Sequence, residues 1–117
     1  QVLYDDLSFL SYMDTCTIFA NALDNAVKAC SEIKEGERKI ELFLKRKKDM
    51  LNIVIKNTKQ NQILESNNRF FTTKSNKEHH GFGIENIKMA VEKYHGLVSI
   101  EYTEDSFVLA VIIPIPV

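Results

Sequence analysis

Asn21-Ala22-Leu23-Asp24-Asn25-Ala26-Val27-Lys28 is predicted to be the middle of a helix, around which the rest of the chain is arranged. With about 3.6 residues per turn, positions i, i+4 and i+7 fall within a stripe roughly 60° wide. Asn21, Asn25 and Lys28 occupy these positions, so two carboxamides and an ammonium group line one edge. Because asparagine is a mediocre helix former, this edge favours a binding role, in which neutral oxygens hold a cation and the lysine meets polyphosphate.

A separate apolar stripe runs along the adjoining face of the same helix. Its members are Ile18, Phe19, Ala22, Leu23, Ala26, Cys30 and Ile33. The asparagine edge therefore borders the core face and does not lie opposite it. We expect the helix to run from about Thr15 to Ser31, with Asp14 as its N-cap. Residues 7–13, which carry apolar side chains on both parities, are expected to form a strand.

The composition indicates one domain of an ordinary globular protein. The chain has 117 residues, of which 44% are hydrophobic and 26% are charged, and we expect a single domain over residues 1–117. No apolar run reaches the roughly 20 residues that span a bilayer, and no secretory signal opens the chain. A net charge of −1 argues against a general nucleic-acid binder. Since the chain opens on Gln1, we expect it to be a piece of a longer protein.

The two cysteines, Cys16 and Cys30, lie on one predicted helix. Fourteen residues separate them, which is about 21 Å at 1.5 Å per residue and too far for a disulfide. Their spacing matches no zinc or redox motif. Free thiols favour a reducing, cytoplasmic setting, and we interpret both as small buried apolar residues.

Two strands are predicted after the helix. Ile40, Leu42 and Leu44 alternate with polar residues over 38–45, and residues 46–49 form a charged hairpin tip. The next strand places Leu51, Ile53 and Ile55 on its inward face. Asn57 continues that parity, so its side chain either ends the strand or forms the floor of a pocket.

Residues 58–80 break the pattern, because they are rich in Asn, Gln, Lys, Ser and Thr. A loop of this length in a compact domain is usually functional or disordered, and both readings stay open. Gly81-Phe82-Gly83 then opens a second helix, whose stripe is Ile84, Ile87, Val91 and Tyr94. Unpaired N–H groups and a positive dipole at a glycine-rich helix start favour phosphate. Gly96 is expected to end this helix as its C′ residue.

A terminal hairpin completes the chain. Residues 98–102 and 107–113 are predicted strands around the turn at Glu104-Asp105, and Pro114 and Pro116 close the sheet edge. The predicted fold is an α/β (α+β) two-layer sandwich: a mixed, mostly antiparallel sheet of about five strands with helices on one face.

In this order, these parts resemble the ATP-binding catalytic domain of sensor histidine kinases, which belongs to the GHKL superfamily with the Bergerat fold. FANALDNAVKAC (residues 19–30) is similar to the N-box of that family, and HGFGIENI (residues 80–87) to its second glycine box. The resemblance covers about residues 14–113. The LDNA form of the N-box and the tail after Gly83 are most similar to the peptide-sensing quorum kinases of Gram-positive bacteria.

The resemblance implies roles for the asparagine edge. Asn25 matches the asparagine that coordinates the Mg²⁺ bridging the phosphates of ATP. Asn21 matches the position of a glutamate general base in the ATP hydrolases of the superfamily, and a neutral amide cannot take a proton from water near pH 7. Lys28 matches a phosphate-contacting lysine. These three residues are the implied catalytic set.

The resemblance also identifies residues 58–82 as an ATP lid. Gly81 and Gly83 match the glycines beside the phosphates, and Phe82 and Ile84 match residues that pack the lid on its helix. Lys74 and His80 lie in the lid and are expected to reach the phosphates.

The adenine box departs from the family pattern. Its usual D-x-G-x-G is here Asn57-Thr58-Lys59-Gln60-Asn61, so the aspartate is an asparagine and both glycines are missing. The amide oxygen of Asn57 can still accept a hydrogen bond from the adenine amino group, without a charge to strengthen it. We therefore expect weaker ATP binding.

The implied function is that of a protein-histidine kinase, which binds Mg-ATP and donates the γ-phosphate to a histidine on a separate dimerisation module. None of His79, His80 and His95 lies on a long amphipathic helix, so the acceptor is expected outside this chain. The implied partners are that module and a response regulator, with no nucleic acid and no membrane contact by this domain. We expect a cytoplasmic domain of a membrane-anchored sensor. Two alternatives remain: a degraded domain that serves as a weak nucleotide-binding or docking module, and a free-standing serine kinase.

Overall fold

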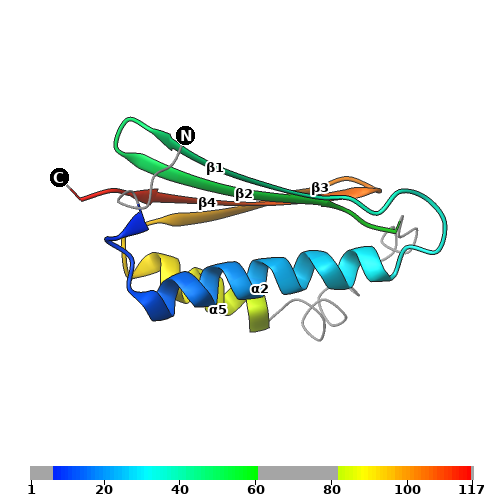
Figure 1. Ribbon diagram of the computed structural model, residues 1–117, viewed down its shortest axis with the longest axis horizontal. Coiled ribbons are helices and arrows are strands. Elements are labelled where there is room, and N and C mark those ends of the chain that lie inside the picture. The colour runs from blue at the N-terminus through cyan, green and yellow to red at the C-terminus, as the bar shows by residue number, and fades with distance from the viewer. Residues whose placement is uncertain (1–6, 61–81, 117) are drawn as a thin grey trace.

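The computed structural model describes residues 7–60 and 82–116, which form two layers (Figure 1). One layer is a sheet, and the helices α2 and α5 lie together on one of its faces. The elements in chain order are α2 (Tyr12–Ser31), β1 (Ile40–Lys47), β2 (Met50–Thr58), α5 (Phe82–Glu92), β3 (Leu97–Tyr102) and β4 (Ser106–Pro114). The predicted two-layer α+β sandwich is confirmed.

The sheet of the described residues has four strands in the order β1-β2-β4-β3. Each neighbouring pair is antiparallel, so both predicted hairpins form and β2 and β4 join them in the centre. We expected a mixed sheet of about five strands. The count is close, and the difference lies at residues 7–13. Pro114 ends an inner strand beside Met50 and does not close an edge of the sheet.

The predicted strand at residues 7–13 is wrong. The N–H of Leu10 donates to the carbonyl of Leu7 at 3.0 Å, which makes a turn, and the helix has already begun at Tyr12. Ser11, in an extended conformation, is the N-cap, and its hydroxyl accepts from the N–H of Asp14 at 2.9 Å. Asp14 is therefore the third helical residue and not the cap. The apolar residues before it pack against the core from a turn, which explains why both parities are apolar.

The core fills the space between the helices and the sheet. Its members from the described residues are Leu10, Ile18, Ala22, Ala26, Leu51, Ile53, Ile55, Ile87, Ala90, Val91, Leu109, Val111 and Ile113. The predicted inward parity of β2 and the stripe of α5 are confirmed. On β1, Leu44 packs against the core, whereas Ile40 and Leu42 are exposed. Because β1 is an edge strand of the described sheet, the core covers it only in part.

The end of α5 differs from the expectation at one residue. His95, and not Gly96, has the left-handed conformation, with φ 63°, and the N–H of Gly96 donates to the carbonyl of Val91 at 3.1 Å. Gly96 is needed for a close approach, because an added Cβ would lie 2.7 Å from the carbonyl oxygen of Ile112.

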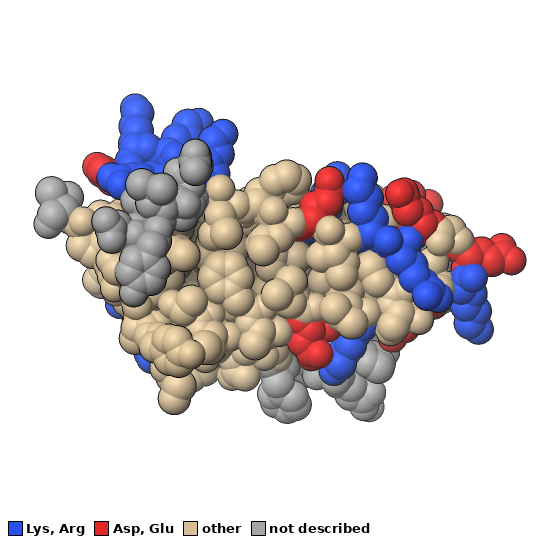
Figure 2. Space-filling model, viewed as in Figure 1, with Lys and Arg blue, Asp and Glu red and all other residues tan. Residues whose placement is uncertain are grey.

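The charged hairpin tip between β1 and β2 is solvent-exposed, as predicted. Figure 2 shows its basic side chains gathered at one corner of the molecule, above the hairpin. The turn places Lys48 at φ 59°, and its carbonyl accepts from Nε of Arg46 at 3.0 Å. In the part of the chain that the structure describes, neither α2 nor α5 is long and apolar enough to cross a membrane.

Candidate nucleotide site

Helix α2 carries the asparagine edge, and its three residues differ in exposure. Asn21 is half-buried, Asn25 is buried with 7% of its surface exposed, and Lys28 is exposed. The helix turns its apolar face, with Ile18 and Ala22, into the core. The predicted position of the edge, at the border of the core, is confirmed.

Asn25 is the residue whose side chain is best suited to bind a ligand. Within residues 7–60 and 82–116, its Oδ1 is a buried side-chain oxygen without a hydrogen-bond partner. A buried carbonyl oxygen left unpaired costs about 1–3 kcal/mol. Amide oxygens are hard ligands of the kind that Mg²⁺ accepts, so this atom fits a cation that the fold is expected to bind.

Asn21 faces the start of the second helix. Its Nδ2 donates to the carbonyl of Thr17 at 2.7 Å, one turn back on α2. A Cβ added to Gly83 would stand 3.4 Å from Oδ1 of Asn21. The glycine in the first turn of α5 therefore lies against the asparagine edge, in a turn whose N–H groups have no partner within the helix.

Lys28 stands at the solvent side of the edge. Its Nζ lies 3.6 Å from Oδ2 of Asp24, and both side chains are more than half exposed. An exposed i,i+4 pair of this kind contributes only about 0.3–0.5 kcal/mol. The ammonium group can therefore turn from Asp24 to a more strongly charged ligand at little cost.

Asn57 ends the inward face of β2, as predicted, and only 2% of its surface is exposed. It stands between Ile40 of β1 and Phe107 of β4 in the register of the sheet. Its Nδ2 donates to the carbonyl of Thr58 at 2.9 Å. That bond fixes the amide so that Oδ1 is the remaining acceptor.

Cys30 ties the end of α2 to the strands near Asn57. Its Sγ lies 3.6 Å from the carbonyls of Lys39 and Thr58 and from Oγ1 of Thr58. Both cysteines are free thiols, as expected, but Cys16 is exposed. The interpretation of Cys16 as a buried apolar residue is wrong, because it lies away from the core stripe.

A hollow of about 710 Å³ opens at the end of the sheet where Thr58 of β2 pairs with Ser106 of β4. It is lined by Ile33, Lys34, Glu35, Gly36, Glu37, Thr58, Lys59, Gln60, Asp105 and Ser106. None of Asn21, Asn25, Lys28 and Asn57 is among them, whereas Thr58, Lys59 and Gln60 belong to the predicted lid.

The predicted lid lies mostly outside the described residues. Lys74, His80 and Gly81 fall there, as does the side chain of Phe82, so their expected roles stay predictions. Ile84 is half-buried in α5. The described residues bring Asn21 against Gly83, with Asn25 and Lys28 on the same edge of α2 and Asn57 at the end of β2.

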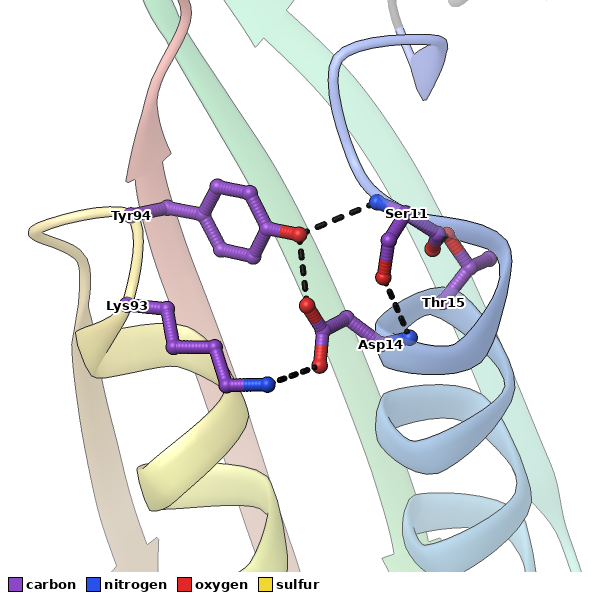
Figure 3. Close-up of polar contacts among 5 residues, drawn as sticks. All are labelled: Ser11, Asp14, Thr15, Lys93 and Tyr94. Carbon is purple, nitrogen blue, oxygen red and sulfur yellow. Dashed lines mark hydrogen bonds and ion pairs between the residues drawn. The ribbon is translucent and has the colours of Figure 1, made fainter.

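One polar cluster near the helices was not predicted from the sequence (Figure 3). Oδ2 of the buried Asp14 accepts from the hydroxyl of Tyr94 at 2.6 Å, and Oδ1 accepts from Nζ of Lys93 at 3.0 Å. These bonds, that of Tyr94 first, lower the pKa of Asp14 below its ordinary value of 3.8, against the opposing effect of burial. In the sequence, Tyr94 is the last residue of the apolar stripe of the second helix, and this was the only sign that its side chain packs inward.

The donor set tells what kind of cation would suit the site. In the described part of the chain, no group of three or more His, Cys, Asp or Glu side chains converges on a point. A zinc-type centre therefore has no ligands there. A neutral amide oxygen such as that of Asn25 suits Mg²⁺, which keeps several waters and shares a site with phosphate oxygens.

Comparisons with known proteins agree with the fold. The chain is similar to two nucleotide-free crystal forms of the catalytic domain of histidine kinase ThkA, with TM-scores of 0.53 and 0.54 and sequence identities of 20% and 22%. The similarity covers 84% of this chain in both cases, and 65% and 66% of those chains. At such identities it shows the fold alone. No curated protein matches the chain. Residues 10–114 match the family described as GHKL domain, and because this match spans most of the sequence, the chain belongs to the GHKL domain family.

Proposed function

We propose that this GHKL domain binds Mg-ATP between α2 and the start of α5 and presents the γ-phosphate to a histidine of another module. One observation carries the proposal, which is the buried Oδ1 of Asn25, unpaired among the residues that the structure describes. It stands one turn along α2 from Asn21, which lies against Gly83. An unpaired oxygen beside a helix start is a natural place for a cation with a phosphate chain.

Asn25 is the residue that would hold the metal. Mg²⁺, when bound, would offset the charge of the phosphates. Asn25 supplies an oxygen that is already buried and aligned, so little reorganisation is needed on binding. Lys28, released from its weak pair with Asp24, adds a positive charge at the solvent end.

Asn21 and Gly83 would position the phosphates, and neither residue can act as a general base. The amide of Asn21 is neutral and its Nδ2 is engaged with Thr17, so this side chain cannot take a proton from water. Gly83 carries no side chain, so phosphate can approach the N–H groups of the first turn of α5. The expected result is a site that keeps ATP for a protein acceptor, with catalysis mainly by positioning and electrostatics.

Asn57 is the proposed contact for the base. Its Oδ1 would accept from the adenine amino group, with Nδ2 fixed on the carbonyl of Thr58. A neutral acceptor makes a weaker bond than a carboxylate, which supports weak nucleotide affinity.

The wider setting is part of the same proposal. We propose that the acceptor histidine lies on a dimerisation module of a longer sensor kinase, that a response regulator takes the phosphoryl group onward, and that the parent is a membrane-anchored, peptide-sensing quorum kinase whose catalytic domain is cytoplasmic. The whole chain, 1–117, would act as the single catalytic domain. Support comes from the N-box and the second glycine box and from the GHKL match.

Titration calorimetry with Mg-ATP tests the proposal. Wild type is expected to bind, and Asn25→Ala to bind at least about tenfold more weakly, a loss of about 1.4 kcal/mol. Asn52→Ala, the same change on the outward parity of β2, is the matched control and should bind as wild type does. Absence of heat for wild type at millimolar nucleotide would reject nucleotide binding and leave the docking role.

A further inference from the structure

The cluster of Asp14, Lys93 and Tyr94 joins the beginning of α2 to the turn after α5 (Figure 3). The hydroxyl of Tyr94 both donates to Asp14 at 2.6 Å and accepts from the N–H of Ser11 at 3.0 Å. Lys93 reaches the other carboxylate oxygen at 3.0 Å. Asp14 is buried, so its bond from Tyr94 is partly shielded from water and directional, whereas the Lys93 side chain is 64% exposed.

The ring of Tyr94 is fixed independently of its hydroxyl. It packs edge-on against Phe9, with the ring centroids 5.9 Å apart and an angle of 86° between the planes. This contact survives removal of the hydroxyl group. The hydrogen bonds can therefore be tested separately from the packing of the ring.

The cluster and the proposed nucleotide site lie at opposite ends of one helix pair. Asp14 contacts the segment just after α5, whereas Asn21 contacts Gly83 in its first turn. The two helices thus run antiparallel over this stretch (Figure 1). Seven residues of α2, about 10 Å, separate the two contacts.

Between these contacts the helices meet through apolar side chains of the core, such as Ile18, Ile87 and Val91. These contacts are close-packed, but apolar burial is itself non-directional, so a directional contact adds to what holds one helix in place along the other. The bonds of Asp14 are directional and lie at one end. They therefore help to define the register that places Gly83 beside Asn21 at the other end.

We propose that Asp14, Tyr94 and Lys93 are positioning residues, which fix α5 along α2 so that Gly83 faces Asn21. The consequence for nucleotide affinity rests on the proposed function. The consequence for the placement of Gly83 does not, so the two can fail separately.

The experiment compares Tyr94→Phe and Asp14→Asn with wild type. Amide NMR of the free protein is expected to show a shifted Gly83 resonance in both variants, and calorimetry a Mg-ATP affinity about three- to tenfold weaker. The double variant should lose no more than the worse single one, since both changes break one interaction. Val111→Ala, a core change in β4, controls for lost stability and should leave the Gly83 resonance and the affinity unchanged.

Each result has one meaning. An unchanged Gly83 resonance in both variants overturns the positioning role, whether or not ATP binds. A shifted resonance with unchanged affinity supports the positioning role and overturns its consequence for nucleotide affinity, because the register would then not matter to the site. If wild type binds no nucleotide, the proposed function fails, and the Gly83 resonance still decides whether the cluster sets the register.

Discussion

Oδ1 of Asn21 stands 3.4 Å from the point where a Cβ on Gly83 would lie. This distance is an ordinary van der Waals contact, so the site has room for one methyl group and no more. Gly83→Ala is therefore expected to fold with a stability within about 0.5–1 kcal/mol of wild type, helped by the better helix propensity of alanine. Mg-ATP affinity should fall, because the methyl group stands where phosphate would approach the helix start. Denaturant unfolding and calorimetry on one preparation check both parts, and unchanged affinity would remove Gly83 from the phosphate site.

Asn25 should show a conflict between stability and binding. Alanine removes the unpaired oxygen and is a better helix former than asparagine, so Asn25→Ala is expected to raise the free energy of unfolding of the free domain by about 1 kcal/mol. The same variant should lose nucleotide binding. Urea unfolding without nucleotide measures the first effect. A loss of stability would show that Oδ1 has a partner in solution.

The lowered pKa of Asp14 predicts how the free energy of unfolding depends on pH. Its pKa is lowered in the folded protein, chiefly by the hydrogen bond from Tyr94 and then by Lys93. Its contribution is therefore fully present above the unfolded value, near 3.8, and is lost as pH falls through the lower, folded pKa. The difference in unfolding free energy between wild type and Asp14→Asn should be constant around neutral pH and shrink below about pH 4. A difference that stays the same in acid would mean that the carboxylate charge contributes nothing.

Substitutions at two adjacent residues after α5 should change the stability of the fold in opposite directions. His95 has φ 63°, a conformation that costs a non-glycine residue about 1 kcal/mol, so His95→Gly is expected to stabilise the fold slightly. Gly96→Ala should destabilise it by about 1–3 kcal/mol, because the new Cβ would lie 2.7 Å from the carbonyl oxygen of Ile112 and from Cγ1 of Val91. Thermal unfolding of both variants measures the two changes in stability. Equal and small effects would show that β4 can move aside.

Asn57 should matter to the base and not to the phosphates. Asn57→Ala is expected to weaken ATP more than it weakens inorganic triphosphate, because the triphosphate lacks the amino group that Oδ1 would contact. Competition titrations of both ligands with Mg²⁺ give the two ratios. Equal losses would remove Asn57 from the base pocket.

Local periodicity predicted most of the fold. The stripe of α5 and the alternation of β2 were sufficient to place Ile87, Val91 and Asn57 correctly. The exposure of Leu42 was not predicted, because the alternation of apolar and polar residues does not show whether a strand lies at the edge of a sheet. The start of α2 was missed because the apolar residues before Ser11 pack from a turn.

The candidate site was predictable only in part. The helical spacing of Asn21, Asn25 and Lys28 placed them on one edge, and the parity of β2 brought Asn57 inward. The bond between Asp14 and Tyr94 joins residues 80 positions apart, and no periodic pattern reports a contact of that length. The same holds for the contact of Gly83 with Asn21, which needed the packing of one helix on the other.

A crystal structure of the domain with Mg²⁺ and a non-hydrolysable ATP analogue tests the central claim most directly. We expect Oδ1 of Asn25 to ligate the metal, at the 2.0–2.1 Å typical of Mg²⁺, with the phosphates beside Gly83. An Asn25 amide turned away from the ligand, with side chains of the protein itself in place of phosphate beside Gly83, would contradict the account.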